Sequence, residues 1–395
     1  MPMGGVNQHA VNGDGSTYYN FSKFTYSSHS MITTCGFTVT LVNGAVLYCN
    51  EQQSFALGQY RAYLKTTSDP QGRTATLNYG LTNGVMRLTN YVDFSNYKTT
   101  LFYQGSSIDK VTAIVDPFGR TNSFTYSTNG FLVGITNPLS FGSTFTYDSQ
   151  GMITNLSTPY GNTAFLYSVN TNIGNVVTRS MQVVLPSSGK QLYIYRDQST
   201  YLNSTSSIPL LPSSYSTNEL PNTGSFTNTF DNTWMDARNS FYWSPHNFDQ
   251  LSAAFRSSGN FSDLSTNDYK LARLRHWLRQ AQYVDALSGT LSIQRDSSPD
   301  GLQDGQKTWY DYWGKSPTID TNGTTNWYSV GSSPSPKFVA FRLPNGDTRY
   351  TYQEYNAQGN PTLGVSTWSP TGGGVQTRTN TFLYDSINGI DLIGV

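Results

Sequence analysis

The sequence predicts an all-β protein built from short strands and turns, and three observations support this. Only 12% of the 395 residues are Asp, Glu, Lys or Arg, which disfavours a helical bundle because its solvated faces need charged residues. The chain holds 28 Tyr and 21 Phe, and aromatic residues favour strands. Short segments with alternating apolar and polar residues recur between turn residues, as expected for half-buried strands.

Composition and charge also exclude several classes. The 24 acidic residues balance the 24 Lys and Arg, so no net charge attracts nucleic acid. No apolar run is long enough to predict a membrane span, and the first residues lack the features of a signal peptide. Cys35 and Cys49 flank a predicted hairpin with a turn at Asn43-Gly44. They are too few for a disulfide scaffold, and whether they pair is left open.

An internal repeat is the most informative feature. The segment Asp69-Pro-Gln-Gly-Arg-Thr74 recurs as Asp116-Pro-Phe-Gly-Arg-Thr121, and Phe-Thr-Tyr occurs at both 124–126 and 145–147. Repeats of this kind indicate stacked supersecondary units. We expect the residues that define the repeat to stabilise the fold, and they are Asp116, Pro117, Gly119, Tyr126, Gly130, Pro138, Tyr147, Asp148, Gly151, Pro159, Tyr167, Tyr384 and Asp385.

Each repeat is predicted to contain a turn, a strand, a second turn and a second strand. Asp-Pro-x-Gly matches a type I turn, since Pro presets φ at its second position. A Gly four residues after the Tyr, such as Gly130 after Tyr126, supplies a second turn with positive φ. One hairpin cannot bury its aromatic face alone, so the hairpins must pack on their neighbours.

The motifs Tyr147-Asp148-x-x-Gly151 and Tyr384-Asp385, with the spacing of the repeat, resemble the RHS or YD-repeat proteins. The resemblance covers about 65–170 and 340–395. It implies a β-sheet ribbon that curls into a hollow shell; bacterial members enclose a C-terminal toxic domain, and the related animal teneurins act in adhesion. It therefore implies a secreted or cell-surface structural segment. Its partners would be the remainder of a longer chain and an enclosed C-terminal domain.

Two departures from the family limit this inference. The Asp-Pro-x-Gly-Leu signature of the family's C-terminal core motif is absent, so neither self-cleavage nor a toxic payload is assigned. The chain also ends inside the strand expected after Asn388-Gly389. We therefore expect the final repeat to be truncated.

Four regions are predicted: an N-terminal β-hairpin region (1–64), YD repeats (65–174), a divergent or inserted section (175–335) and further YD repeats (336–395). Within the divergent section, residues 198–230 are rich in Ser, Thr, Asn and Pro, which predicts a surface loop.

One helical insertion is predicted near 267–286, with Ser265 or Thr266 as its N-cap. Its apolar stripe would be Leu271, Leu274, Trp277, Leu278 and Ala281. Its basic residues are interpreted as the outer face of this helix, since no aromatic residues are interleaved with them to suggest nucleic-acid binding. They are Lys270, Arg273, Arg275, His276 and Arg279.

The segment 309–313 suggests an alternative function. In a strand, Trp309, Asp311 and Trp313 share one face, and exposed Trp rings stack on sugars. These three residues are therefore the candidate ligand-binding residues of a carbohydrate-binding or adhesion module, with a glycan as the partner. Burial between the sheet and the insertion explains the same residues.

Signs of metal binding or catalysis are weaker. Asp296, Asp300 and Asp304 fit either an irregular calcium loop or Asp-Gly turns, and the choice is left open. The three Glu residues, Glu51, Glu219 and Glu354, form no recognisable catalytic pair, so a glycoside hydrolase is the least favoured class. We expect a non-enzymatic protein without a cofactor, a catalytic residue or a metal site.

Overall fold

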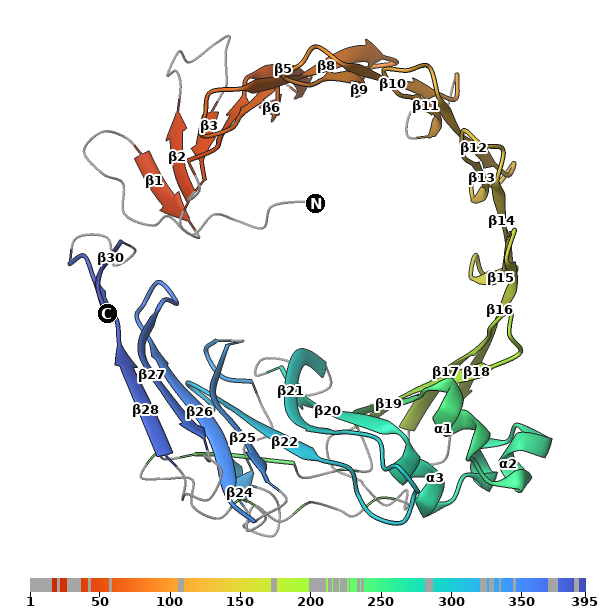
Figure 1. Ribbon diagram of the computed structural model, residues 1–395, viewed down its shortest axis with the longest axis vertical. Helices are drawn as coiled ribbons and strands as arrows, with labels where there is room; N and C mark the ends of the chain where they lie inside the picture. The colour runs from red at the N-terminus through yellow and green to blue at the C-terminus, as the bar shows by residue number, and fades with distance from the viewer. Residues whose placement is uncertain are drawn as a thin grey trace. The chain divides into compact units, whose positions relative to one another are not determined.

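The structure is a computed structural model. It describes residues 16–19, 22–26, 37–41, 44–56, 59–105, 110–171, 176–198, 211, 215, 220, 226, 228–232, 235, 238–280, 287–319, 325–326, 330–333, 335–343, 346–368, 376–386 and 391–395. It confirms the all-β class, with helices confined to one stretch (Figure 1). The chain divides into two compact units, residues 1–161 (unit 1) and 162–395 (unit 2). The region limits predicted at 64, 174 and 335 stay predictions.

Unit 1 is a single-layered antiparallel sheet in which almost every strand pairs with the next one along the chain. The exception is the hairpin of β5 (Glu51–Ala56) and β6 (Gln59–Tyr63), whose strands pair only with each other, while β4 pairs with β7. The remaining strands are β1 (Ser16–Tyr19), β2 (Ser22–Tyr26), β3 (Phe37–Thr40), β4 (Val46–Cys49), β7 (Thr66–Ser68), β8 (Thr74–Thr82), β9 (Val85–Val92), β10 (Lys98–Tyr103), β11 (Val111–Val115), β12 (Thr121–Tyr126), β13 (Leu132–Thr136), β14 (Gly142–Tyr147) and β15 (Ile153–Thr158).

The predicted hairpin at Asn43-Gly44 lies between β3 and β4, with Gly44 at positive φ. Cys49 is opposite Phe37, whereas strict pairing around a two-residue turn would have placed it opposite Thr38. Cys49 is a free cysteine in the structure, and Cys35 lies outside the described residues.

One turn type joins many of the strands. In the turn after β11, the Gly119 N–H donates to the Asp116 carbonyl, and the Asp116 N–H donates to the Arg120 carbonyl. Gly119 has φ +79°, the left-handed conformation expected at the end of a three-residue hairpin loop. The carboxylate Oδ1 of Asp116 also accepts from the N–H groups of Phe118 and Arg120.

The same turn recurs at Asp69, Asp93, Asn137, Asp148 and Asn356, each of which accepts from the backbone two and four residues later. The positive φ predicted for Gly130 and Gly151 is confirmed, at +88° and +81°. After Pro138, Ser140 takes the glycine position with φ +66°.

The repeated tyrosines lie at β-bulges. The pairing register shifts at Tyr79, Tyr103, Tyr126 and Tyr147. Each hydroxyl donates to the carbonyl fifteen residues earlier: Leu64, Leu88, Val111 and Leu132, at 2.8, 2.7, 2.9 and 2.6 Å respectively. Bulges leave backbone groups outside the regular ladder, and these hydroxyls satisfy some of them.

Unit 2 also consists of antiparallel strands that pair in chain order. Its last described hairpin, β29 (Leu383–Tyr384) and β30 (Leu392–Gly394), is separate, as are the short strands β23 (Thr318–Ile319) and β24 (Thr325–Asn326). The sheet contains β16 (Gly161–Thr171), β17 (Val176–Val184), β18 (Lys190–Gln198), β19 (Asn239–Trp243), β20 (Arg273–Arg279), β21 (Leu287–Arg295), β22 (Lys307–Tyr312), β25 (Pro336–Arg342), β26 (Thr348–Tyr355), β27 (Pro361–Trp368) and β28 (Gln376–Thr381).

The single helix predicted near 267–286 is wrong. Unit 2 has instead three short α-helices, α1 (Pro245–Asp249), α2 (Ala253–Ser258) and α3 (Thr266–Leu271), and a 3-10 turn, η2 (Phe261–Asp263). The N-cap prediction at Ser265 is confirmed, because Ser265 and Asp268 form a reciprocal capping box. The chain then leaves the helix at Ala272 and becomes strand β20.

Strand β20 explains why the helical pattern misled. Leu274, His276 and Leu278 are all buried, which is the two-residue period of a strand. A helical stripe would have needed His276 on the polar face. Ala281 lies outside the described residues, so the rest of the predicted stripe is not addressed.

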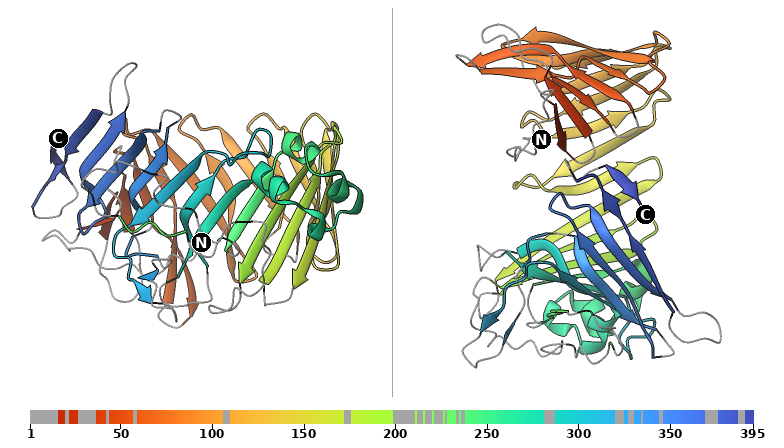
Figure 2. Two further views of the ribbon diagram at one scale, coloured as in Figure 1. Left: turned by 90° about the horizontal axis from the view of Figure 1, so that it is seen from below. Right: turned by 90° about the vertical axis from the view of Figure 1, so that its left-hand side faces the viewer.

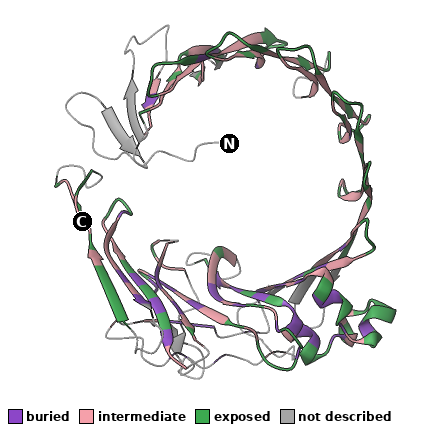
Figure 3. Cartoon of the chain, in the orientation of Figure 1, coloured by how far each residue is buried: buried purple, intermediate pink, exposed green. Residues whose placement is uncertain are grey.

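One face of the unit 2 sheet carries the core, where α1, α2 and α3 pack over the strands (Figures 1 and 2). Figure 3 shows most of the buried residues in this unit. The prediction of a surface loop over 198–230 is wrong for the described residues of this stretch. Tyr215, Leu220 and Phe230 are buried in the core, and Leu211 and Phe226 pack against it. The apolar residues spaced through this polar segment anchor it to the sheet.

Candidate functional site

Two of the three candidate glycan-binding residues are buried. Trp309 is 1% exposed and Asp311 is fully buried, both on the core face of β22. Trp313 follows the strand, packs against the core and donates from its indole N–H to the Gln353 carbonyl at 3.0 Å. Because Trp309 cannot present its ring to solvent, the predicted sugar platform at these residues is wrong. Trp309 is instead buried beneath the described residues 211, 215, 220, 226 and 228–232, which we call the covering segment.

Asp311 is instead the centre of a buried ion cluster. Its Oδ2 lies 3.1 Å from Lys337 Nζ, and its Oδ1 lies 3.5 Å from Lys315 Nζ. Its carboxylate also accepts from the N–H of Thr229 at 2.6 Å and from the Thr229 hydroxyl at 2.7 Å. Lys315 Nζ in turn donates to the Thr229 carbonyl at 2.7 Å. The cluster therefore fastens the covering segment at Thr229 to β22 and β25.

Two lysines, Lys315 and Lys337, share the carboxylate of Asp311 in this buried cluster. Burial lowers the pKa of Lys315 below its ordinary value, while the charges of Asp311 and Asp231 act in the opposite direction. Lys337 Nζ also lies 5.2 Å from the centre of the Trp313 ring, a cation–π distance. Removing the Asp311 charge would leave two lysines in a buried site without their shared counter-ion.

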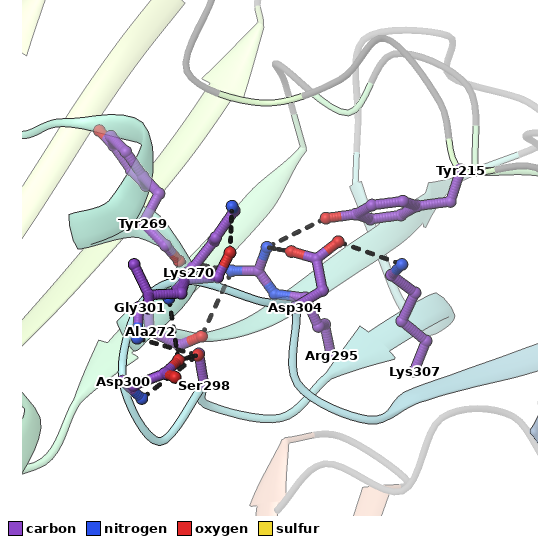
Figure 4. A network of polar contacts seen from close by, with 11 residues as sticks. Tyr215, Tyr269, Lys270, Ala272, Arg295, Ser298, Asp300, Gly301, Asp304 and Lys307 are labelled. Carbon is purple, nitrogen blue, oxygen red and sulfur yellow. Dashed lines mark hydrogen bonds and ion pairs between the residues drawn. The ribbon is translucent and has the colours of Figure 1, made fainter. Parts of the chain in front are cut away.

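A second network is centred on Arg295, which is 1% exposed (Figure 4). Its Nη1 donates to the Tyr215 hydroxyl and to Asp304 Oδ1, both at 3.0 Å. Its Nη2 donates to the carbonyls of Tyr269 and Ala272. Arg295 therefore joins the C-terminal end of α3, where carbonyls lack helical partners, to the covering segment and to the loop after β21.

This network also settles the position of the three aspartates for which calcium was considered. Asp304 lies between two cations, Arg295 and Lys307, the latter 3.1 Å from its Oδ2. Asp300 accepts from the Leu302 N–H and the Ser298 hydroxyl, and Asp296 is exposed. Over the described part of the chain, no cluster of three metal-binding side chains occurs. The Asp-Gly turn interpretation therefore fits this loop.

Of the basic residues predicted to lie on one helix, Lys270 is in α3 and donates to the Leu302 carbonyl at 2.8 Å, whereas the other four are in β20. His276 is fully buried; its Nε2 is 3.1 Å from an Arg238 amino group and its Nδ1 is 2.7 Å from Asn239 Oδ1. A guanidinium can only donate, so Nε2 accepts and Nδ1 donates. Arg273 and Arg275 are exposed on the opposite face. The prediction of a single outer basic face is therefore wrong.

Exposed apolar side chains gather along one edge of unit 1. The turns after β9, β11, β13 and β15 lie on this edge, because alternate turns of an antiparallel meander share an edge. We call these residues the aromatic rim, with exposed fractions in parentheses: Phe94 (57%), Tyr97 (50%), Phe118 (70%), Leu139 (75%), Phe141 (57%) and Tyr160 (91%). The rings of Tyr97 and Phe118, from neighbouring turns, are 5.7 Å apart. Apolar exposure of this extent marks interaction surfaces.

An open pocket of about 650 Å³ lies beside β27 and β28, and its lining includes Glu354, Leu363, Phe382, Tyr384 and Asp385. The Tyr352 hydroxyl donates to Glu354 at 3.0 Å. Burial, together with this contact, raises the pKa of Tyr352 to about 12. The predicted repeat residues Tyr384 and Asp385 thus line a pocket. The tyrosine contact to a distant carbonyl is made in this region by Tyr355, to Pro336 at 3.2 Å.

Comparisons with known proteins give a limited result. No family model and no curated protein matches the chain. Among solved structures the chain is similar to TcdB2-TccC3 (11% identity, TM-score 0.22, covering 87% of this chain and 20% of that chain). It is also similar to TcdB2-TccC3-TEV (11%, 0.23, 93% and 20%) and to a Photorhabdus luminescens Tc holotoxin pore with a mutation in TccC3 (11%, 0.22, 88% and 18%). The chain spans about a fifth of these structures, and scores this low do not establish a common fold.

No helix in the described ranges is long and apolar enough to cross a membrane.

The buried charged side chains are the feature that the sequence analysis did not predict. Arg196, Arg238 and Arg295 are among the largest fully buried side chains. Arg196 and Arg295 lie within β18 and β21, and Arg238 directly precedes β19. The alternation Leu192, Ile194, Arg196 in β18 was the available signal, since it places an arginine on the apolar face.

Proposed function

We propose that this chain is a non-enzymatic structural segment of a secreted or cell-surface RHS-type repeat protein, and that its sheets form part of a shell around a polypeptide cargo. The proposal is supported by the repeated turn, bulge and tyrosine contact of unit 1, in which the YD motif places Tyr147 at a bulge, Asp148 as the turn cap and Gly151 at positive φ. In this interpretation the tyrosines, glycines and capping aspartates maintain a wall of stacked hairpins.

The buried ion clusters support the same role. Asp311 and Arg295 bind the covering segment and α3 to the sheet through charge-assisted hydrogen bonds. Both groups are buried and hydrogen-bonded to other parts of the chain, which suits rigidity. A shell wall needs such rigidity because the single-layered repeats have little core of their own.

Protease protection of the intact natural protein tests this proposal. The full-length product is purified from its source and digested, and the resistant peptides are identified by mass spectrometry. We expect a resistant segment outside the repeats that becomes sensitive when mild denaturant opens the shell. Digestion of every non-repeat segment at the rate of an unstructured chain would contradict enclosure.

The aromatic rim favours a second function, that of a carbohydrate-binding or adhesion module. Its rings are accessible, unlike Trp309, and they repeat at every second strand, which is about 9–10 Å along the sheet edge. Aromatic faces at regular spacing are suited to stacking on successive sugars of an extended polysaccharide. The rim thus takes the role that was first assigned to the segment 309–313.

Binding to insoluble and soluble polysaccharides tests this alternative. Phe118→Ala and Phe141→Ala should abolish saturable binding while the melting temperature stays within a few degrees of wild type. Leu81→Ala is the matched control, because Leu81 is 63% exposed on the opposite edge of the same sheet. Equal loss in the control, or no binding by the wild-type protein, would exclude the glycan function.

A further inference from the structure

The face of the unit 2 sheet opposite the core carries a row of polar and basic side chains. Directly opposed residues in an antiparallel sheet lie on the same face. The strand register joins eight residues across eight neighbouring strands, namely Arg179, Tyr195, Ser240, Arg275, Gln294, Thr308, Phe341 and Arg349. We call this set the arginine row, and it contains no acidic residue.

A second, shorter row lies beside it, two residues along each strand. It joins Met181, Tyr193, Tyr242 and Arg273. Arg179, Arg273, Arg275 and Arg349 are all exposed, and none of the four forms an ion pair within the described residues. The neighbouring acids are Asp296, directly after β21, and Asp347, two residues before Arg349. The arginines therefore exceed the neighbouring acids on a protein with no net charge.

The rings between the arginines are already occupied on their faces. Tyr193 and Tyr242 lie with ring centres 4.7 Å apart, and Arg273 lies 5.7 Å from the Tyr242 ring. Arg179 lies 5.9 Å from the Tyr195 ring. Nucleic-acid bases and sugars need free ring faces for stacking, so these rings are better suited to hold the guanidinium groups in place.

The exposed guanidinium groups of the row indicate which ligand it can bind. Guanidinium groups bind carboxylates through paired N–H donors, and stacked arginines lose less freedom on binding. The backbone of every central strand is paired on both sides, so a partner cannot add a strand and must be bound through side chains. We propose that the arginine row, with Arg273 beside it, binds an acidic polypeptide segment through that segment's Asp and Glu carboxylates.

This inference goes beyond the proposed shell, because the charge of the row would attract an acidic segment whether or not the chain encloses a cargo. It also replaces the prediction that Arg273 and Arg275 lie on the solvent-exposed face of a helix. As a strand, β20 places Arg273 opposite Tyr242, and it places Arg275 opposite Ser240, whose other neighbour is Tyr195.

Fluorescence anisotropy with fluorescein-labelled polyglutamate tests the inference on the full chain. We expect saturable binding that weakens at high ionic strength, and a loss of about tenfold or more in affinity for the R273Q/R275Q variant, since truncating charged contacts costs this much or more. Arg256→Gln, on the exposed side of α2, is the matched control with the same change per site. Arg275→Lys keeps the charge and should retain part of the affinity.

The outcomes separate clearly. Equal affinity of R273Q/R275Q and R256Q would overturn the inference, and so would tighter binding of labelled oligothymidylate than of polyglutamate, which would indicate a nucleic-acid surface. Circular dichroism confirms that each variant is folded; if R273Q/R275Q is not, Arg179→Gln provides the same comparison from β17. A negative result here leaves protease protection of the natural protein unaffected, so this inference and the proposed shell can fail separately.

Discussion

The hydroxyl of Tyr126 donates to the carbonyl of Val111 at 2.9 Å, and Val111 is the residue opposite the bulged Tyr103. Tyr103 in turn reaches Leu88, which is opposite the bulged Tyr79. Tyr147 continues the series through Leu132, opposite the bulged Tyr126. Each tyrosine thus hydrogen-bonds at the bulge formed by the previous one. This linkage gives the repeated tyrosine a physical reason beyond its apolar area.

Removing one of these hydroxyls should therefore weaken unit 1. Tyr126→Phe leaves the Val111 carbonyl without this donor, and we expect a loss of about 1 kcal/mol in the free energy of unfolding. Tyr147→Phe should behave similarly. Urea denaturation measures both, with Tyr160→Phe as the control, since Tyr160 is 91% exposed. Equal stability of all three variants would show that the tyrosine contacts do not support the sheet.

The stability lost when a turn glycine is replaced by alanine should depend on the backbone conformation and on the space around its Cβ. Gly119→Ala places a side chain at φ +79° with nothing within 4 Å, so we expect a loss of about 1–2 kcal/mol from backbone strain alone. Gly151→Ala should lose more, because its Cβ would also lie 2.9 Å from the Phe131 ring. Gly105→Ala, with open space and no positive φ, is the control. Thermal melts that place Gly105→Ala with the other two would contradict the assigned turn geometry.

Acid should weaken the Asp116 turn. Desolvation acts to raise the pKa of Asp116, but the N–H groups of Arg120 and Phe118 and the guanidinium of Arg120 together outweigh it, so the pKa lies below its ordinary value. A lowered carboxyl pKa contributes stability above the unfolded value of about 4, and that contribution is lost as the pH falls through the folded value. The melting temperature of Asp116→Asn should therefore lie below wild type at pH 7 and approach it near pH 3. A constant difference at both pH values would refute this assignment.

Loss of the Asp311 charge should be far more costly than loss of an exposed one. Asp311→Asn keeps the size of the side chain but removes the counter-ion that Lys315 and Lys337 share, while Asp231 still acts on Lys315, and we expect a loss of about 3–5 kcal/mol. Asp249→Asn, at the exposed end of α1, should change stability by less than about 0.5 kcal/mol. Guanidinium denaturation compares the two. Similar small losses would mean that the covering segment does not depend on this cluster.

The sequence predicted the features that are local. Asp116, Gly119 and Gly151 were identified because the turn itself needs a capping carboxylate and a left-handed residue, and both requirements lie within a few positions of the chain. The strand alternation around Phe124 and Tyr126 was predicted for the same reason. The left-handed conformation of Ser140 was not predicted. Serine does not itself favour this conformation, which is imposed by the pairing of the flanking strands β13 and β14.

Long-range features could not be predicted in this way. The spacing of Leu271 and Leu274 fits a helix as well as a strand. The strand places His276 in the core, where its partners are Arg238 and Asn239, and the sequence does not show these partners. Trp309 and Asp311 share a face as predicted, yet Thr229, which comes from 82 residues away, decides that this face is covered. Burial of this kind depends on a segment whose own composition looks like a surface loop.

The central claim is that this chain forms part of a repeat wall around a polypeptide. Cryo-electron microscopy of the intact natural protein tests it most directly. We predict a continuous antiparallel ribbon, with the Tyr126–Val111 contact in place, and density for a polypeptide on the inner side of the wall. An open ribbon with both faces in contact with solvent and no enclosed density would contradict the claim.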